Sequence, residues 1–269
     1  MIKIITFVFS IYCIAAPAQY ENPDSISRIQ LHMGIGYYMA GDDLAIYYSG
    51  ADNNRFLQVT RDNPNSVTRI REALGGYPYD IAELPSNLIY RNQVSFMLSG
   101  TYAINQHWRI LAMMQQVKLE AIGSFTLSVE RTNTQNPNED YIEQYSIVGK
   151  ERRSHFQLGA IYRIPLNPSF YLNLGGGLDI NTVEVLSNSI FVGSREFALP
   201  AATIYQPQAG QITTSGIGFF AFPELAYENV KGLGIFIRAS YINTKISLNK
   251  VTEDNTSVWV PALGFSWSF

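Results

Sequence analysis

The sequence predicts an all-β fold, a transmembrane antiparallel up-and-down β-barrel of eight strands with long extracellular loops. Three observations lead to this prediction. Bulky apolar residues alternate with small or polar ones along eight segments, and a period of two places the two sets on opposite faces of a strand. The links between these segments alternate between long and short. The last segment is strongly aromatic, and in a soluble protein it would form an exposed, adhesive sheet edge.

Each predicted strand has bulky apolar side chains on one face only. In the first strand, Ile29, Leu31 and Met33 share one face, while Gln30 and His32 share the other. The apolar face would contact acyl chains and the second face would enclose a polar lumen. The eight segments are residues 29–38, residues 93–104, a strand that Trp108 opens, and residues 153–164, 170–181, 216–228, 233–241 and 259–269.

The connections separate a membrane barrel from a soluble one. A soluble up-and-down barrel would point its apolar residues inward and has no reason to keep one end much longer than the other. Membrane barrels combine tight periplasmic turns with extended extracellular loops, and an even strand number places both termini in the periplasm. Short links are expected at residues 105–107, 165–169 and 230–232, and long links at residues 39–92, 118–151, 182–215 and 243–257.

The long links are expected to contain structure of their own. Residues 65–75 predict a short helix, with Asn65 or Ser66 as its cap and Gly75 at its C-terminal side. Alternation in residues 124–130 and 141–148 predicts a hairpin above the membrane, and residues 190–197 follow the same pattern. Ten membrane strands would result if residues 44–60 held a further pair, but those runs are shorter than the ~9–11 residues of a spanning strand.

Composition excludes several classes of protein. The net charge of −3 argues against a nucleic-acid partner. After the first residues, no apolar run approaches the ~20 residues of a membrane helix, which excludes a helical membrane protein. Aromatic residues make up 13% of the chain, and a barrel uses such residues in its two interfacial girdles.

The first residues predict an export signal. Lys3 precedes an apolar stretch at residues 4–16, and Ala16-Pro17-Ala18 offers small residues for cleavage. We therefore expect a signal peptide at residues 1–18 and a barrel domain at residues 19–269. The only cysteine, Cys13, lies inside the signal, so the mature chain would have no thiol for a disulfide or a metal site. A lipid anchor at Cys13 would need a small residue where Tyr12 stands.

Parity places a set of charged residues and histidines in the lumen. The bore of an eight-stranded barrel is just wide enough for side chains to fill it. These groups either satisfy one another and plug the barrel or form the gate of a narrow pore. The inward set is His32, Arg109, Arg153, His155, Arg163, Asp179, Glu224, Glu228 and Arg238.

Register predicts two lumen pairs. If Glu228 lies opposite Gly234 across the last short turn, Glu224 lies opposite Arg238, and opposed charges of opposite sign form an ion pair. If the lumen forms a narrow pore, this ion pair would be its gate.

The same reasoning applies at residues 165–169. If Arg163 lies opposite Tyr171, His155 lies opposite Asp179. Either register could slip by two residues.

Neither an enzyme nor a metal site is predicted. His107 lies in a short turn, and His32 and His155 are explained as polar groups of the lumen. A catalytic triad around His155 and Asp179 would need a nearby serine, and Ser154 has the wrong parity. No cluster has the spacing of metal ligands, and no cofactor is expected.

The final strand carries a family resemblance. Phe265, Trp267 and Phe269 alternate with serines, and this ending resembles the C-terminal signature of the small bacterial outer-membrane β-barrel domain family, the porin-like eight-stranded proteins. The resemblance implies insertion into the cell outer membrane, contact with outer-membrane lipid and recognition of these aromatics by the barrel assembly machinery. It also implies a structural or adhesive surface role, a narrow channel or a part of a larger machine.

Two functions follow as hypotheses. The first is a structural or surface-interaction role through large extracellular loops, with a lumen plugged by charged side chains. The segment from Met39 to Asn92 is long enough to fold back or to bind an extracellular protein or another surface partner. The alternative is a narrow porin-like channel for small solutes or ions.

Overall fold

The computed structural model describes residues 28–51, 54–131, 141–200, 212–249 and 252–269. The expected signal peptide at residues 1–18 lies outside the described residues. None of the helices in the described ranges is long and apolar enough to cross a membrane.

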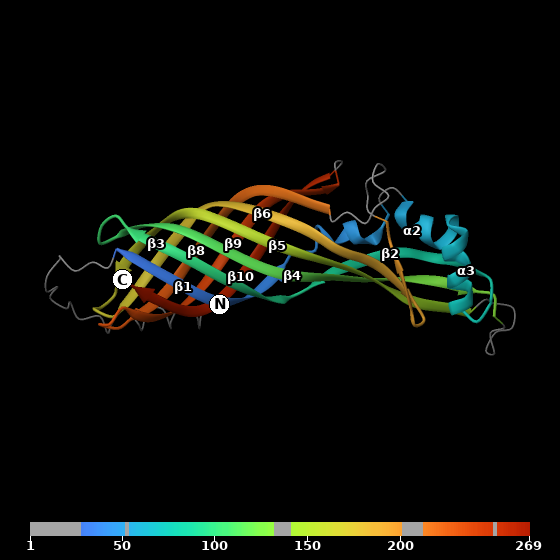
Figure 1. Ribbon diagram of the computed structural model, residues 1–269, viewed down its shortest axis with the longest axis horizontal. Helices are drawn as coiled ribbons and strands as arrows, with labels where there is room; N and C mark the ends of the chain where they lie inside the picture. The colour runs from blue at the N-terminus through green and yellow to red at the C-terminus, as the bar shows by residue number, and fades with distance from the viewer. Residues whose placement is uncertain (1–27, 52–53, 132–140, 201–211, 250–251) are drawn as a thin grey trace, which may run out of the picture.

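Eight antiparallel strands close into a barrel (Figure 1). Successive strands of the ring pair with one another, and the first pairs with the last along Gln30–Ser268 to Ala40–Val258. The prediction of eight membrane strands is confirmed. The ring consists of β1 (Ile29–Ala40), β3 (Gln93–Ala103), β4 (Trp108–Val129), β5 (Tyr141–Pro165), β6 (Phe170–Val192), β8 (Ile212–Glu228), β9 (Leu233–Asn249) and β10 (Thr252–Ser268).

An apolar belt surrounds the barrel. Large outward-facing side chains are strongly exposed in the isolated chain: Met33 is 65% exposed, Phe96 67% and Phe265 69%. Across the described strands, no outward-facing residue of this belt is charged. Such a surface is stable only against lipid. The fold is therefore a transmembrane β-barrel of the outer-membrane type.

Polar side-chain pairs mark the edge of the belt on the outer surface. Each pair joins two neighbouring strands by a hydrogen bond at the height where the outward residues change from apolar to polar. The pairs are Gln116–Ser154 at 3.3 Å, Thr182–Ser215 at 3.3 Å and Asn243–Ser257 at 2.8 Å.

The opposite end of the barrel carries the three short turns, and we call it the short-turn end. Each turn contains an asparagine whose side-chain oxygen accepts hydrogen bonds from two backbone N–H groups that follow it. These residues are Asn105, Asn167 and Asn229. The C-terminus lies at this same end (Figure 1).

Beyond the belt, the wall of the barrel continues on one side as an open sheet. β4, β5 and β6 extend past the lipid boundary. There β2 (Tyr79–Arg91) pairs with residues Glu120–Val129 of β4, and β7 (Arg195–Ala198) pairs with β6. The strand pairing predicted between residues 124–130 and 141–148 and the hairpin predicted at residues 190–197 are confirmed. The links expected at residues 118–151 and 243–257 are mostly strand, because backbone pairing continues beyond the apolar belt.

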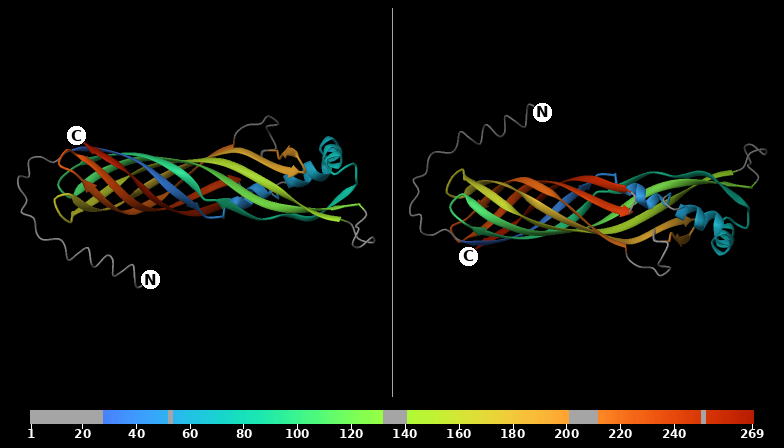
Figure 2. Two further views of the ribbon diagram at one scale, coloured as in Figure 1. Left: turned by 90° about the horizontal axis from the view of Figure 1, so that it is seen from below. Right: turned by 90° about the horizontal axis from the view of Figure 1, so that it is seen from above.

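Helical turns cover this sheet (Figure 2). They are η1 (Ala45–Ser49), α2 (Arg55–Leu57), η3 (Gln58–Asp62) and α3 (Pro64–Ala73). The described part of residues 44–60 forms helical turns and contains no strand pair, so the ten-strand alternative is wrong. We call this assembly of helical turns, β2, β7 and the ends of β4, β5 and β6 the platform.

The helix predicted at residues 65–75 is confirmed as α3, but its predicted cap is wrong. Asn63 caps the helix, because its Oδ1 accepts hydrogen bonds from the backbone N–H groups of Asn65 at 3.0 Å and Ser66 at 3.3 Å. Pro64 occupies the first helical position, where its fixed φ and missing N–H are tolerated. The cap therefore lies one residue before the proline.

The apolar side chains of the platform continue the buried apolar cluster of the barrel interior. Phe56 of α2 packs edge to face against Phe125 of β4, with ring centroids 5.0 Å apart. Ile70 of α3 is buried in the same cluster. Arg195 of β7 donates to Glu72 of α3 at 2.7 Å and holds the helix against the small hairpin.

Candidate functional site in the lumen

The middle of the lumen is crossed by an ion pair. Glu224 of β8 lies directly opposite Arg238 of β9, and Glu228 lies opposite Gly234, so the predicted register is confirmed. Arg238 donates to one oxygen of Glu224, from Nε at 2.8 Å and from a terminal nitrogen at 2.5 Å. Asn173 of β6 donates to the other oxygen at 2.7 Å. Both charged side chains are fully buried.

Aromatic rings enclose this pair. The Arg238 guanidinium carbon lies 4.1 Å from the centroid of the Phe222 ring and 5.1 Å from that of Phe236. A terminal nitrogen of Arg238 lies 3.0 Å from Sδ of Met113, on the other side of the barrel. Sequence reasoning did not single out these residues, although each has the inward parity of its strand. The large apolar side chains at these inward positions were the available sequence signal that the bore is filled.

The second predicted pair is in contact, but its register was wrong. Asp179 lies opposite Gln157, and His155 lies opposite Asn181, a slip of two residues. The turn places Pro165 opposite Tyr171, which moves the pairing of the whole hairpin. The contact persists along the diagonal, with Nδ1 of His155 3.0 Å from Asp179 Oδ2.

A hydrogen-bond network surrounds the Asp179 carboxylate. Gln157 donates to it at 2.9 Å and Thr244 at 2.8 Å. The second ring nitrogen of His155 lies 2.8 Å from the hydroxyl of Tyr38 on β1. The network therefore links β1, β5, β6 and β9 across the lumen.

The Glu224–Arg238 pair and the Asp179 network form two layers of polar contacts in the lumen. A third layer, around Glu151, closes the barrel at the platform end. Glu151 accepts hydrogen bonds from Tyr48 at 2.6 Å, from Tyr90 at 2.9 Å and from Nε of Arg153 at 2.5 Å. Tyr48 belongs to η1, so the long first link folds back into the mouth of the barrel. The ring of Tyr48 lies against Gly149, where a Cβ atom would come within 2.0 Å of its Cδ1.

The sequence did not reveal the third layer as a site. Arg153 was placed in the lumen, but Glu151 was assigned to the edge of a long loop. The alternation of Glu151, Arg153 and His155 was an available signal, because all three share one parity on β5. The length of the first link allowed it to fold back, but the sequence did not single out Tyr48 as the residue that reaches Glu151.

Most inward charges lie in ion pairs with other protein groups, whereas Arg109 hydrogen-bonds only to the neutral side chain of Gln30 among the described residues. In the ranges that the structure describes, no group of three or more His, Cys, Asp or Glu residues could hold a metal ion. The arrangement can hold the strands together and close the bore. Any opening would require the Glu224–Arg238 pair to separate from its aromatic neighbours.

The aromatic residues of the C-terminal signature lie on the lipid face. Phe265, Trp267 and Phe269 are all exposed, and the rings of the last two stack with centroids 4.8 Å apart. β10 pairs with β1 and closes the ring. Recognition of these residues by an assembly machinery stays a prediction.

Comparison with known proteins gives similarity of structure only. No family model matches the chain, and no curated protein matches it. Three of the similar solved structures are Neisserial surface protein A (10% identity, TM-score 0.47, 90% of this chain and 97% of that one), OprG of Pseudomonas aeruginosa (12%, 0.41, 92% and 99%) and the attachment invasion locus protein Ail of Yersinia pestis (12%, 0.37, 90% and 99%). By name they are a surface protein, an outer-membrane protein and an attachment invasion locus protein, and no residue role is taken from them.

Proposed function

We propose that this chain is a closed β-barrel of the outer membrane that acts through its platform as a surface-interaction protein. We place the short-turn end in the periplasm and the platform outside the cell, because barrels of this type have short periplasmic turns and longer extracellular loops. The observation that carries the proposal is the contrast between the two halves: buried ion pairs and hydrogen-bonded side chains fill the lumen, whereas the platform extends beyond the apolar belt and presents exposed tyrosine and isoleucine side chains.

The filled lumen argues against conduction. A pore needs a continuous hydrated path, but Glu224 and Arg238 are buried, and the Arg238 guanidinium lies against the rings of Phe222 and Phe236. Separating the pair would leave two uncompensated charges in a confined interior, which is costly. The narrow channel is therefore the second candidate.

The outer end of the platform supplies a contact surface. Tyr77 is 41% exposed, Tyr141 40% and Ile142 65%. Tyr141 lies opposite Val129, which in turn lies opposite Tyr79 of β2, so these residues share one end of the sheet. Arg131 covers the ring of Tyr141 at 4.8 Å. Tyrosine and arginine are enriched at protein interfaces. We call Tyr77, Arg131, Tyr141 and Ile142 the platform tip.

A planar-bilayer measurement tests the closed lumen. We expect the purified barrel to give no discrete conductance steps. The Glu224→Ala and Arg238→Ala variants each remove one partner of the barrier and are expected to open at least transiently. Discrete openings of the unmodified protein that change in either variant would establish the channel instead.

A cell-binding assay tests the platform tip. Gram-negative cells that express the chain are compared with empty cells for aggregation and for attachment to a layer of animal epithelial cells. We expect binding that is lost in the double variant Tyr77→Ser, Ile142→Ser. Val230→Ser is the matched control, because Val230 is fully exposed at the short-turn end. Equal binding by empty cells, or by the double variant, would contradict the proposal.

A non-catalytic role is part of the proposal. Both ring nitrogens of His155 already have partners, Asp179 and Tyr38, and neither partner is a serine. We expect His155→Ala to leave the lipid A and phospholipid profiles of the host membrane unchanged. A changed profile would indicate an enzyme.

A further inference from the structure

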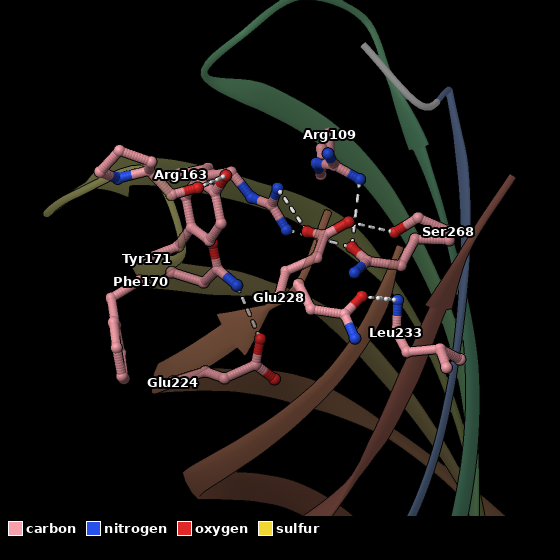
Figure 3. A network of polar contacts seen from close by, with 12 residues as sticks. Arg109, Arg163, Phe170, Tyr171, Glu224, Glu228, Leu233 and Ser268 are labelled. Carbon is pink, nitrogen blue, oxygen red and sulfur yellow. Dashed lines mark hydrogen bonds and ion pairs between the residues drawn. The ribbon is translucent and has the colours of Figure 1, made fainter. Parts of the chain in front are cut away.

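Two arginines converge on one acceptor in the mouth of the barrel at the short-turn end (Figure 3). A terminal nitrogen of Arg109 donates to Oε1 of Gln30 at 3.2 Å, and a terminal nitrogen of Arg163 donates to the same oxygen at 3.1 Å. Arg109 is 5% exposed and Arg163 6%. A neutral amide oxygen thus stands where two guanidinium groups meet.

The carboxylate of Glu228 in this mouth already has hydrogen-bond partners. Glu228 Oε2 lies 3.3 Å from a terminal nitrogen of Arg163, and Glu228 Oε1 accepts a hydrogen bond from Ser268 at 2.5 Å. Within the described residues, Arg109 forms no ion pair. The mouth therefore buries two positive charges against one carboxylate. A buried charge without a counter-charge is strongly unfavourable in a protein interior.

Unused donors lie in the same place. The Nε–H groups of both Arg109 and Arg163 are buried and have no hydrogen-bond partner in the described structure. The ring of Tyr171 covers the face of the Arg163 guanidinium at 4.2 Å, which leaves only its edges for hydrogen bonds. The edge of a guanidinium matches the geometry of an oxyanion, either carboxylate or phosphate.

The mouth has access to solvent on one side only. The side chains of Arg163 and Glu228 are 8% and 14% exposed, so the cluster meets water at the short-turn end. Deeper in the bore, Asn173 and the Glu224–Arg238 pair close the passage.

We propose that Gln30, Arg109, Arg163, Glu228 and Ser268, the mouth cluster, bind a small oxyanion through Arg109 and the Nε–H group of Arg163. The anion supplies the missing negative charge and accepts the unused Nε–H donors. Phosphate and small carboxylates share this chemistry. The anion would come from the periplasm if the short-turn end faces that compartment, as the proposed function has it. The binding itself does not depend on this orientation.

The test is an anion titration of the refolded barrel in zwitterionic micelles. The Arg Nε–Hε resonances are followed by NMR while sodium phosphate or sodium acetate replaces sodium chloride at constant ionic strength. We expect saturable shifts of the Arg109 and Arg163 signals. Saturation by phosphate alone assigns a phosphate site, and saturation by acetate alone assigns a carboxylate site. Chemical shifts that change linearly with the concentration of both anions would overturn the proposal, because they would show that no specific anion site exists in the mouth cluster.

Matched variants locate the site. Arg109→Gln is expected to weaken anion binding at least about tenfold, because it removes the guanidinium without a carboxylate partner. Arg109→Lys keeps the charge but loses the planar fork, so it is expected to bind with intermediate affinity. Arg91→Gln, which alters an exposed ion pair with Glu120, is the control and should bind like the unmodified protein. Unchanged affinity in both Arg109 variants would also overturn the assignment, whereas the conductance measurement is independent of this result.

Discussion

The hydroxyl of Tyr48 donates a 2.6 Å hydrogen bond to Glu151, and this contact fastens the long first link of the chain inside the barrel. Tyr90 donates to the same carboxylate oxygen at 2.9 Å. The ring of Tyr48 rests on Gly149, where no larger residue would fit. The platform and the barrel are thus joined through a buried carboxylate.

Removing the Tyr48 hydroxyl should destabilise this junction. We expect Tyr48→Phe to lower the free energy of unfolding by about 1.5–3 kcal/mol, because a hydrogen bond to a buried charged group is lost while the ring remains. Urea unfolding in lipid vesicles measures the change. Tyr37→Phe is the control, since Tyr37 points outward from β1 and should have little effect. Equal stability of the two variants would contradict the role of the contact.

The Glu224–Arg238 pair allows a double-mutant cycle. Each of Glu224→Leu and Arg238→Met should destabilise the barrel by about 3–5 kcal/mol, because each leaves one buried charge without its partner. The double variant should recover most of that loss, since two apolar side chains replace the pair. The exposed pair Arg91–Glu120 is the control, and Arg91→Gln should cost no more than about 1 kcal/mol. Additive losses in the double variant would show that the two residues do not act together.

A charge on the lipid face tests the position of the membrane. Leu174→Arg places a guanidinium near the middle of the apolar belt and should cost about 2–4 kcal/mol of folding free energy. Thr182→Arg lies on the same strand in the polar row at the edge of the belt, so it should cost no more than about 1 kcal/mol. Equilibrium folding into lipid vesicles compares them. Similar costs for both variants would place the membrane elsewhere.

The platform core should unfold separately from the barrel. Phe56→Ala removes a buried ring that packs on Phe125, and a loss of about 3–5 kcal/mol is expected for such a truncation. We expect faster tryptic cleavage at Arg61 and Arg69, while the barrel keeps its heat-modifiable migration in gels. Ile46→Ala is the control, because Ile46 is exposed. Loss of the barrel itself in Phe56→Ala would show that the two parts are one cooperative unit.

The sequence by itself determined which residues face lipid. Lipid on one side and a crowded lumen on the other impose opposite requirements on successive residues, so the period-two pattern is legible without knowledge of any partner. It also predicted the Glu224–Arg238 pair correctly, since the tight turn between β8 and β9 places Glu228 opposite Gly234.

Only the tertiary structure decided the remaining contacts. The turn before β6 shifts the pairing by two residues, and His155 reaches Asp179 along a diagonal that strict opposition did not predict. Tyr48 reaches Glu151 because a helical turn folds back into the mouth, a contact between segments far apart in the chain. Beyond the lipid boundary many outward residues are polar, and inward residues such as Phe125 pack on helical turns. The sheet therefore continues there through long-range pairing and a shared core, which local alternation does not encode.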